Sequence, residues 1–138
     1  MSIEYRFKNT DWAVILGASS GFGGAAAIEL AEHGMNICGI HFDRAATLPN
    51  AEKVRSGCEA KGVKVMFFNI NASDPEKRNE VVDTLSNEFT SPESNVKVLL
   101  HSLAFGSLKP LVAREEKNQL TQAQVEMTMD VMANSLIY

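Results

Sequence analysis

The best chemical signal in the chain is a run of small residues, Gly17-Ala18-Ser19-Ser20-Gly21-Phe22-Gly23. It follows a short apolar segment at residues 12–16 that is typical of a buried parallel strand, and it precedes an alanine-rich helical segment. Gly17 suits the tight turn that leaves a strand, while Gly21 and Gly23 allow the backbone and the helix to approach an anion closely. The helix N-terminus would add unpaired N–H groups, and Ser19 and Ser20 would add hydroxyl donors. The pattern therefore predicts a pyrophosphate-binding turn. An ordinary glycine-rich turn is the alternative, but the position of the motif in a β-α-β unit favours pyrophosphate binding.

The rest of the chain alternates between strand-like and helix-like spacing of apolar residues. Strands are expected at residues 12–16, 35–42, 63–68 and 96–100. Helices are expected at residues 21–32 and 49–60, from Ser73 onward and from Thr121 onward, with Gly34 and Gly62 closing the first two. This alternation predicts a parallel sheet with helices on both faces, because crossovers between parallel strands are right-handed. We therefore expect an α/β fold with a single domain over residues 1–138.

Two of the expected helices begin with capping signals. Ser73 and Glu76 have the spacing of a capping box, with Pro75 in the first turn, and Thr121 and Gln124 repeat that spacing. The apolar stripes of these helices are Val81, Val82, Leu85 and Phe89, and then Val125, Met129, Met132 and Leu136. No capping signal follows the last stripe, so we expect this helix to continue to Tyr138 and the chain to be part of a longer protein.

The composition of the 138 residues excludes several classes of protein. With 45% hydrophobic residues and a net charge of −4, the chain is typical of a globular domain rather than of a disordered or nucleic-acid-binding one. No apolar run approaches the roughly 20 residues that span a bilayer, and the first 12 residues do not resemble a secretory signal. Cys38 and Cys58 lack metal-ligand spacing. We therefore expect reduced thiols, no metal site and a cytoplasmic location.

The spacing of the glycines is more specific than their number. Three residues separate Gly17 from Gly21 and the close pair comes last, whereas the general dinucleotide fingerprint places two close glycines first. In this respect the chain resembles the short-chain dehydrogenase/reductase family from about Asp11 to its end, with Leu16 in place of the family's usual Thr. The resemblance implies an incomplete Rossmann-type doubly wound parallel sheet with strand order 3-2-1-4. It also implies an NAD(P)-dependent oxidoreductase.

The resemblance assigns further coenzyme contacts after the second and third strands. His41, Asp43 and Arg44 follow the second strand, where an acid holds the adenosine ribose hydroxyls and a base accepts a 2′-phosphate. His41 and Arg44 favour NADP, while Asp43 keeps NAD as the other choice. Asn69 stands before Ile70 in place of the family's usual Asp, and its carboxamide oxygen can still accept from the adenine amino group. The alternative for Asp43 and Arg44 is a solvated charged loop, and the alternative for Asn69 is an asparagine that only turns the chain.

The fourth expected strand runs into His101, Ser102 and Leu103, where most members of the family have an Asn-Asn-Ala-Gly run. This segment, with residues 104–110, is similar to the divergent branch that contains the bacterial enoyl-acyl-carrier-protein reductases, in which a His-Ser pair lies beneath the coenzyme. A buried structural histidine is the alternative for His101. On the last helix the family's catalytic Asn aligns with Met132, whose thioether cannot anchor a proton-relay water. The resemblance therefore implies an enoyl-thioester reductase. A short-chain dehydrogenase acting on a ketone or sugar, and a non-catalytic nucleotide-binding module, are the alternatives.

No catalytic residue can be assigned within the chain. The family uses a Tyr four residues before a Lys, but the only tyrosines are Tyr5 and Tyr138, and neither has that partner. We therefore expect the coenzyme half of a reductase, inactive alone, whose parent takes a carbonyl or acyl-thioester substrate. The strand at residues 96–100 would lie at a sheet edge and the last apolar stripe would be exposed, which predicts a homo-oligomer. We expect neither nucleic acid nor a membrane as a partner.

Overall fold

Four short apolar segments form one parallel sheet in the computed structural model, which describes residues 7–138. The strands are β1 (Asp11–Leu16), β2 (Asn36–His41), β3 (Val65–Asn69) and β4 (Asn95–His101). Their order is β3-β2-β1-β4, and each neighbouring pair is parallel. The predicted fold class and strand order are thereby confirmed.

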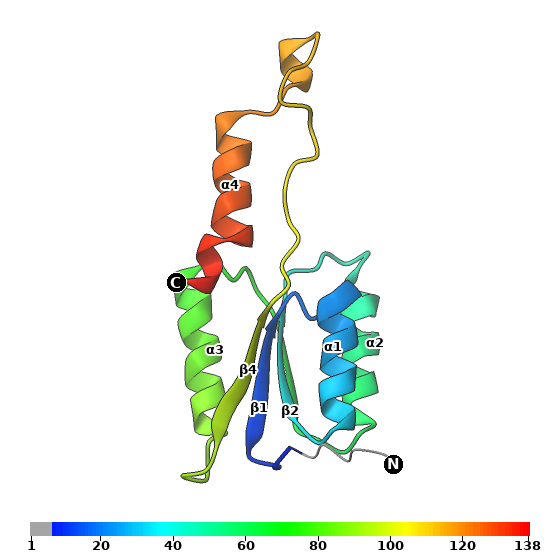
Figure 1. Cartoon of the computed structure of the whole chain (residues 1–138), viewed down its shortest axis with the longest axis vertical. Helices are drawn as coiled ribbons and strands as arrows, with labels where there is room; N and C mark the ends of the chain where they lie inside the picture. Colours follow the sequence, from blue (N-terminus) through cyan, green and yellow to red (C-terminus); the bar gives the residue numbers. More distant parts are fainter. Residues whose placement is uncertain (1–6) are drawn as a thin grey trace, which may run out of the picture. The chain divides into compact units, whose positions relative to one another are not determined.

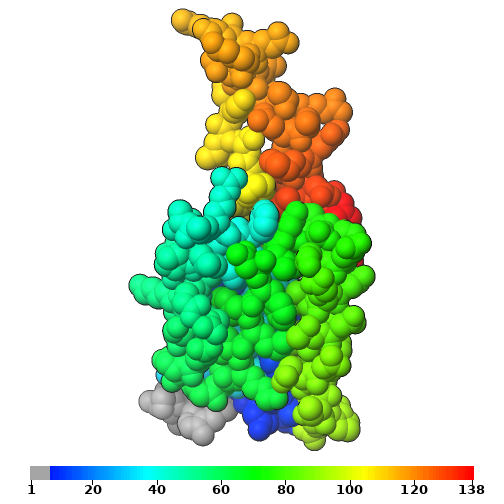
Figure 2. Space-filling model, turned by 180° about the vertical axis from the view of Figure 1, so that it is seen from behind, coloured from blue at the N-terminus to red at the C-terminus, as the bar shows by residue number. Residues whose placement is uncertain are grey.

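The helices cover both faces of this sheet (Figure 1). Helices α1 (Gly21–Glu32) and α2 (Leu48–Glu59) lie on one face, and α3 (Pro75–Asn87) lies on the other. This division follows from the strand order, because right-handed crossovers on the two sides of β1 place their helices on opposite faces. Seen from behind, the edge strand β3 lies between α2 and α3 (Figure 2).

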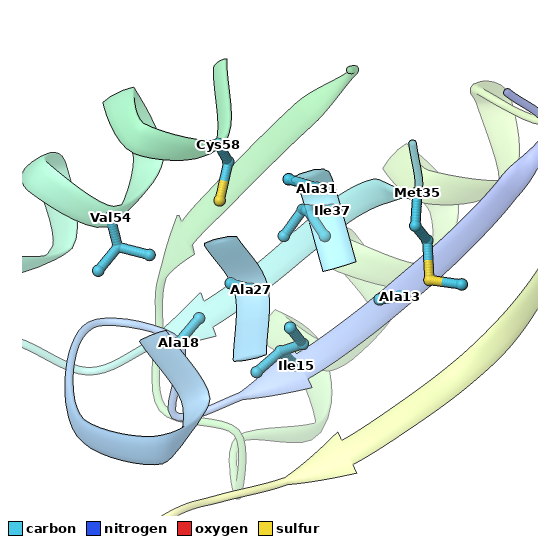
Figure 3. Close-up of a cluster of buried hydrophobic side chains, with 9 residues drawn as sticks. All are labelled: Ala13, Ile15, Ala18, Ala27, Ala31, Met35, Ile37, Val54 and Cys58. Atoms are coloured by element: carbon cyan, nitrogen blue, oxygen red, sulfur yellow. The ribbon is translucent and has the colours of Figure 1, made fainter. Parts of the chain in front are cut away.

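The largest part of the core lies between the sheet and the pair α1 and α2 (Figure 3). Alternate residues of β1 and β2 supply it, since successive side chains of a strand point to opposite faces. Its buried members are Ala13, Ile15, Ala18, Ala27, Ala31, Met35, Ile37, Val54 and Cys58. On the opposite face, the buried Trp12 contacts Phe89 with ring centroids 6.4 Å apart. Burial raises the pKa of the Cys38 thiol to about 12 and that of Cys58 to about 11, so both are poor nucleophiles.

The chain divides into two units, one ending at Ser102 and one comprising Leu103–Tyr138. The second unit contains the 3₁₀ turn η1 (Glu116–Asn118), helix α4 (Gln122–Met132) and the 3₁₀ turn η2 (Asn134–Leu136). The predicted capping box at Thr121 and Gln124 is present. In the described residues, no helix is long and apolar enough to cross a membrane.

Three expectations about helices were wrong in detail. The N-cap of α3 is Asp74, whose carboxylate accepts from the N–H groups of Glu76 and Lys77, whereas the Ser73 hydroxyl is buried without a partner. Val82 is 59% exposed, because at 100° per residue it lies beside the stripe that Val81 and Leu85 bury.

The last helix also ends at Met132 instead of continuing to Tyr138. The hydroxyl of Ser135 donates to the Val131 carbonyl oxygen at 2.6 Å, which is the acceptor that a continuing helix would give to the N–H of residue 135. The chain continues into η2.

Candidate functional site

The candidate site lies at the carboxyl ends of β1 and β4, where the topology of the sheet reverses. The chain leaves β1 toward α1 on one face, whereas it reaches β4 through α3 on the other face (Figure 1). In open α/β sheets such a switch point opens a crevice at the carboxyl ends of the strands. At this end of the sheet, Leu16 is paired with Ile40 on β2 and with His101 on β4.

The glycine-rich turn joins the end of β1 to α1. Gly17 has a φ of +88°, and the N–H groups of Gly17 and Ala18 donate to the Ile40 carbonyl oxygen at 2.8 and 3.1 Å. This bifurcated anchor ties the start of the turn to the end of β2. Gly21, at a φ of +56°, starts α1 in a backbone conformation that other residues rarely adopt.

The N-terminus of α1 carries no side-chain cap. Ser20 is the N-cap residue in extended conformation, yet its hydroxyl makes no capping hydrogen bond. Ser20, Gly21 and Phe22 are exposed, and Phe22 is 90% exposed. The first two residues of this 12-residue helix are therefore exposed, and within residues 7–138 no side-chain cap occupies the helix N-terminus, which suits an anionic ligand.

The third glycine of the motif allows α1 to pack against the turn. A β-carbon at Gly23 would lie 2.1 Å from the Gly17 carbonyl oxygen and 3.4 Å from Cβ of Ser102. The N–H of Ser102 donates to the Leu16 carbonyl oxygen at 2.8 Å. The end of β4 therefore lies directly beside the glycine turn, and Gly23 is the residue that permits this contact.

A hydrogen bond between two side chains follows β2. The Nδ1 atom of His41 lies 2.9 Å from the Asp43 carboxylate, and the two side chains are 4% and 12% exposed. Burial works against ionisation of Asp43, but the hydroxyls of Thr47 and Ser19 and the imidazole of His41 favour its charged form more strongly. The pKa of Asp43 is therefore lowered. The Asp43 carboxylate thus joins the end of β2, the glycine turn and the start of α2.

The sequence-predicted residues of the adenosine end are brought together in part. Arg44 is exposed, and its guanidinium has no hydrogen bond or ion pair among residues 7–138. His41, by contrast, is buried against Phe67, with ring centroids 5.9 Å apart. Arg44 is accordingly available to a ligand, and His41 acts on the site through Asp43.

Asn69 and Ile70 lie beside this loop at the end of β3. The N–H of Ile70 donates to the His41 carbonyl oxygen at 2.8 Å. The carboxamide of Asn69 is hydrogen-bonded to the main chain of Asp43. Thr47 is a neighbour of Asp43 that the sequence interpretation missed, although a Thr before Leu48 and Pro49 is a helix-start signal.

The remaining predicted residues belong to both units. His101 and Ser102 are partly buried at the end of β4, whereas Leu103 begins the second unit. Met132 ends α4, and the Tyr138 hydroxyl donates to the Asp130 carboxylate within the second unit. Tyr5 lies outside the described residues. All but one of the predicted coenzyme-binding residues therefore lie in the first unit, namely Gly17, Ser19, Ser20, Gly21, Phe22, Gly23, His41, Asp43, Arg44, Asn69, Ile70, His101 and Ser102.

Comparisons with known proteins agree with this architecture. Residues 11–138 match the family model described as short chain dehydrogenase. A xylitol dehydrogenase structure with bound NAD⁺ superposes with a TM-score of 0.73 at 18% identity, over 94% of this chain and 45% of that one. A doubly substituted short-chain dehydrogenase/reductase from Serratia marcescens gives 0.71 at 22% identity, over 97% and 48%.

A third structure is the L-sorbose reductase from Gluconobacter frateurii complexed with NADPH and L-sorbose. It gives a TM-score of 0.71 at 20% identity, over 98% of this chain and 46% of that one. The present chain thus spans less than half of the length of each of these proteins.

Proposed function

Because the chain belongs to the short-chain dehydrogenase family, we propose that it is the coenzyme-binding part of an NAD(P)-dependent oxidoreductase. The observation that carries this proposal is the uncapped N-terminus of α1, which the glycine turn places at the carboxyl end of β1 beside β4. A pyrophosphate there would accept hydrogen bonds from the N–H groups at the start of α1 and from the Ser20 hydroxyl. The bound nicotinamide would supply hydride transfer, and the residues of this chain would bind and orient it.

The adenosine end of the site supports NADP as the coenzyme. A 2′-phosphate needs a cation, and Arg44 is an exposed cation without a partner in the described part of the chain. The carboxylate of Asp43 is only 12% exposed and lies 2.9 Å from Nδ1 of His41, so it is less accessible to ribose hydroxyls than Arg44 is to a phosphate. NAD is the alternative, in which Asp43 would instead hold the ribose hydroxyls.

For the substrate, we propose a carbonyl compound of the ketone or sugar class. Two structures of the same fold are named as a xylitol dehydrogenase and an L-sorbose reductase, and this supports a ketose, with a polyol as its reduced form, rather than a thioester. An enoyl thioester is the second candidate, because His101-Ser102 resembles the enoyl-acyl-carrier-protein reductases and Met132 replaces the usual Asn. Assays of the complete gene product with NADPH, comparing ketoses with crotonyl thioesters, would separate the two.

The coenzyme site itself is tested by adding a charge at Ser20 that does not harm the helix. Asp is as good an N-cap as Ser, so Ser20→Asp keeps α1 stable but places a carboxylate where the pyrophosphate would bind. We expect the Kd for NADPH, measured by fluorescence titration, to rise more than about tenfold. The matched variant Ser20→Asn caps the helix without a charge and should bind within about threefold of the wild type.

The proposal fails if the wild-type protein does not bind NADPH or NADH at millimolar concentration. It also fails if Ser20→Asp and Ser20→Asn bind equally well, because the pyrophosphate would then lie elsewhere. Thermal unfolding of both variants checks that α1 is intact.

A further inference from the structure

The carboxamide of Asn69 uses both of its polar atoms on the main chain of a single residue. The N–H of Asp43 donates to Oδ1 of Asn69 at 2.9 Å, and Nδ2 of Asn69 donates to the Asp43 carbonyl oxygen at 3.0 Å. From this geometry we infer that Asn69 is a positioning residue that holds the loop after β2 in its binding conformation. The inference rests on the proposed function only in taking this loop to be the coenzyme's ribose site.

The two hydrogen bonds extend the β2–β3 pairing beyond the end of the sheet. The register of the two strands ends with His41 opposite Asn69, and the N–H of Ile70 donates to His41 O at 2.8 Å. Asp43 lies two residues after His41, where no strand is left to pair with it. The Asn69 side chain supplies the hydrogen-bond donor and acceptor that a neighbouring strand would otherwise give to the Asp43 main chain. Only one orientation of the carboxamide satisfies both bonds, so the contact fixes the side chain as well as the loop.

The loop that Asn69 holds carries the charged groups of the adenosine end. The Asp43 side chain contacts His41, and the hydroxyls of Ser19 and Thr47 face it. Arg44 is the next residue along the chain. A fixed Asp43 backbone therefore fixes the direction in which the chain presents Arg44, and it keeps the Asp43 carboxylate against the glycine turn.

This role differs from that of a residue that reads the adenine ring directly. A direct reader needs only an acceptor for the adenine amino group, and a carboxylate at position 69 would serve as well as a carboxamide. A positioning residue needs a donor and an acceptor together. Asn69→Asp removes the donor and sets a carboxylate against the Asp43 carbonyl oxygen, so it separates the two roles.

The experiment compares Asn69→Asp and Asn69→Ala with the wild-type protein. Amide exchange at Asp43 is measured by NMR without coenzyme, and the Kd for NADPH is measured by titration. We expect exchange at Asp43 to speed up about tenfold and the Kd to rise about tenfold in both variants. The control Asn95→Ala removes side-chain bonds to Asp11 and Glu93 at the opposite end of the sheet, and it should change neither quantity.

The inference is overturned if Asn69→Asp binds NADPH like the wild type, or if exchange at Asp43 is unchanged in both variants. Failure of the proposed function gives a different result, since the wild-type protein would then bind no coenzyme at all. In that case the exchange measurement alone decides whether Asn69 holds the loop, with faster exchange supporting the inference and unchanged exchange overturning it.

Discussion

The carbonyl oxygen of Gly17 occupies the space that a side chain on Gly23 would need. A β-carbon at position 23 would lie 2.1 Å from this oxygen, far inside van der Waals contact. Both residues lie in backbone that other hydrogen bonds fix. The N–H of Gly17 donates to the Ile40 carbonyl oxygen, and Gly23 is part of helix α1. Neither can move aside without shifting the turn or the helix.

Gly23→Ala should therefore damage both stability and coenzyme binding. We expect the free energy of unfolding to fall by about 3 kcal/mol, as measured by urea denaturation. The matched change Gly57→Ala lies in α2, where a β-carbon would meet only the flexible end of Ile28 at 3.3 Å. It should be neutral or stabilising by up to about 1 kcal/mol, because Ala favours helix over Gly. Equal stability of both variants would contradict the observed packing of α1 on the turn.

The parallel sheet with helices on both faces was predictable from local signals, because the apolar run before Gly17 and the alternation of strand-like and helix-like spacing require it. The strand order was predicted from the family resemblance that the glycine spacing carries. Helix boundaries were less predictable. Ser73 and Asp74 are adjacent residues that both cap helices well, and the choice between them depends on backbone angles that no spacing rule contains.

The loop after β2 was only partly predictable, because its geometry depends on contacts between distant residues. Asn69 and Asp43 are 26 residues apart, and their pairing depends on the register of β2 and β3. His41 looked like a cation available to a phosphate, yet packing against Phe67 buries it and turns its Nδ1 to Asp43. Residue types indicated where the charges lie along the chain, while tertiary packing decided that Arg44 is exposed and His41 is buried.

Removing the exposed cation of the ribose site should discriminate between the two coenzymes. For Arg44→Ala we expect the Kd for NADPH to rise at least about tenfold and the Kd for NADH to change less than about twofold, by fluorescence titration. The reason is that only NADPH carries the 2′-phosphate. The control Lys53→Ala removes an exposed positive charge from α2 and should leave both values unchanged. A parallel loss of affinity for both coenzymes would assign Arg44 to the pyrophosphate instead.

The edge strand β4 should make the 138-residue chain self-associate. Within residues 7–138 it pairs only with β1, and its Leu99 is 58% exposed. An apolar sheet edge offers unpaired backbone groups to a second copy. We expect the sedimentation coefficient to rise with protein concentration, and Leu99→Lys to abolish this rise. The control Val82→Lys also replaces an exposed apolar side chain by Lys, but on α3, where Val82 is 59% exposed. It should leave the association intact. A concentration-independent wild-type monomer would refute this prediction.

The hydrogen-bonded carboxylate of Asp43 should make part of the stability depend on pH. Because the pKa of Asp43 is lowered in the folded state, its carboxylate stabilises the protein above its ordinary pKa of about 4, and this contribution is lost as the pH falls through the lower folded value. Asp43→Asn should cost about 1.5 kcal/mol in urea denaturation at pH 7, and the difference from the wild type should shrink below about pH 4. Thr47→Val removes one hydroxyl that faces the carboxylate, so it should move the start of this acid loss to higher pH. An equal difference in the free energy of unfolding between Asp43→Asn and the wild type at pH 7 and pH 3 would contradict this prediction. The charged form of the Asp43 carboxylate would then not be stabilised by its neighbours.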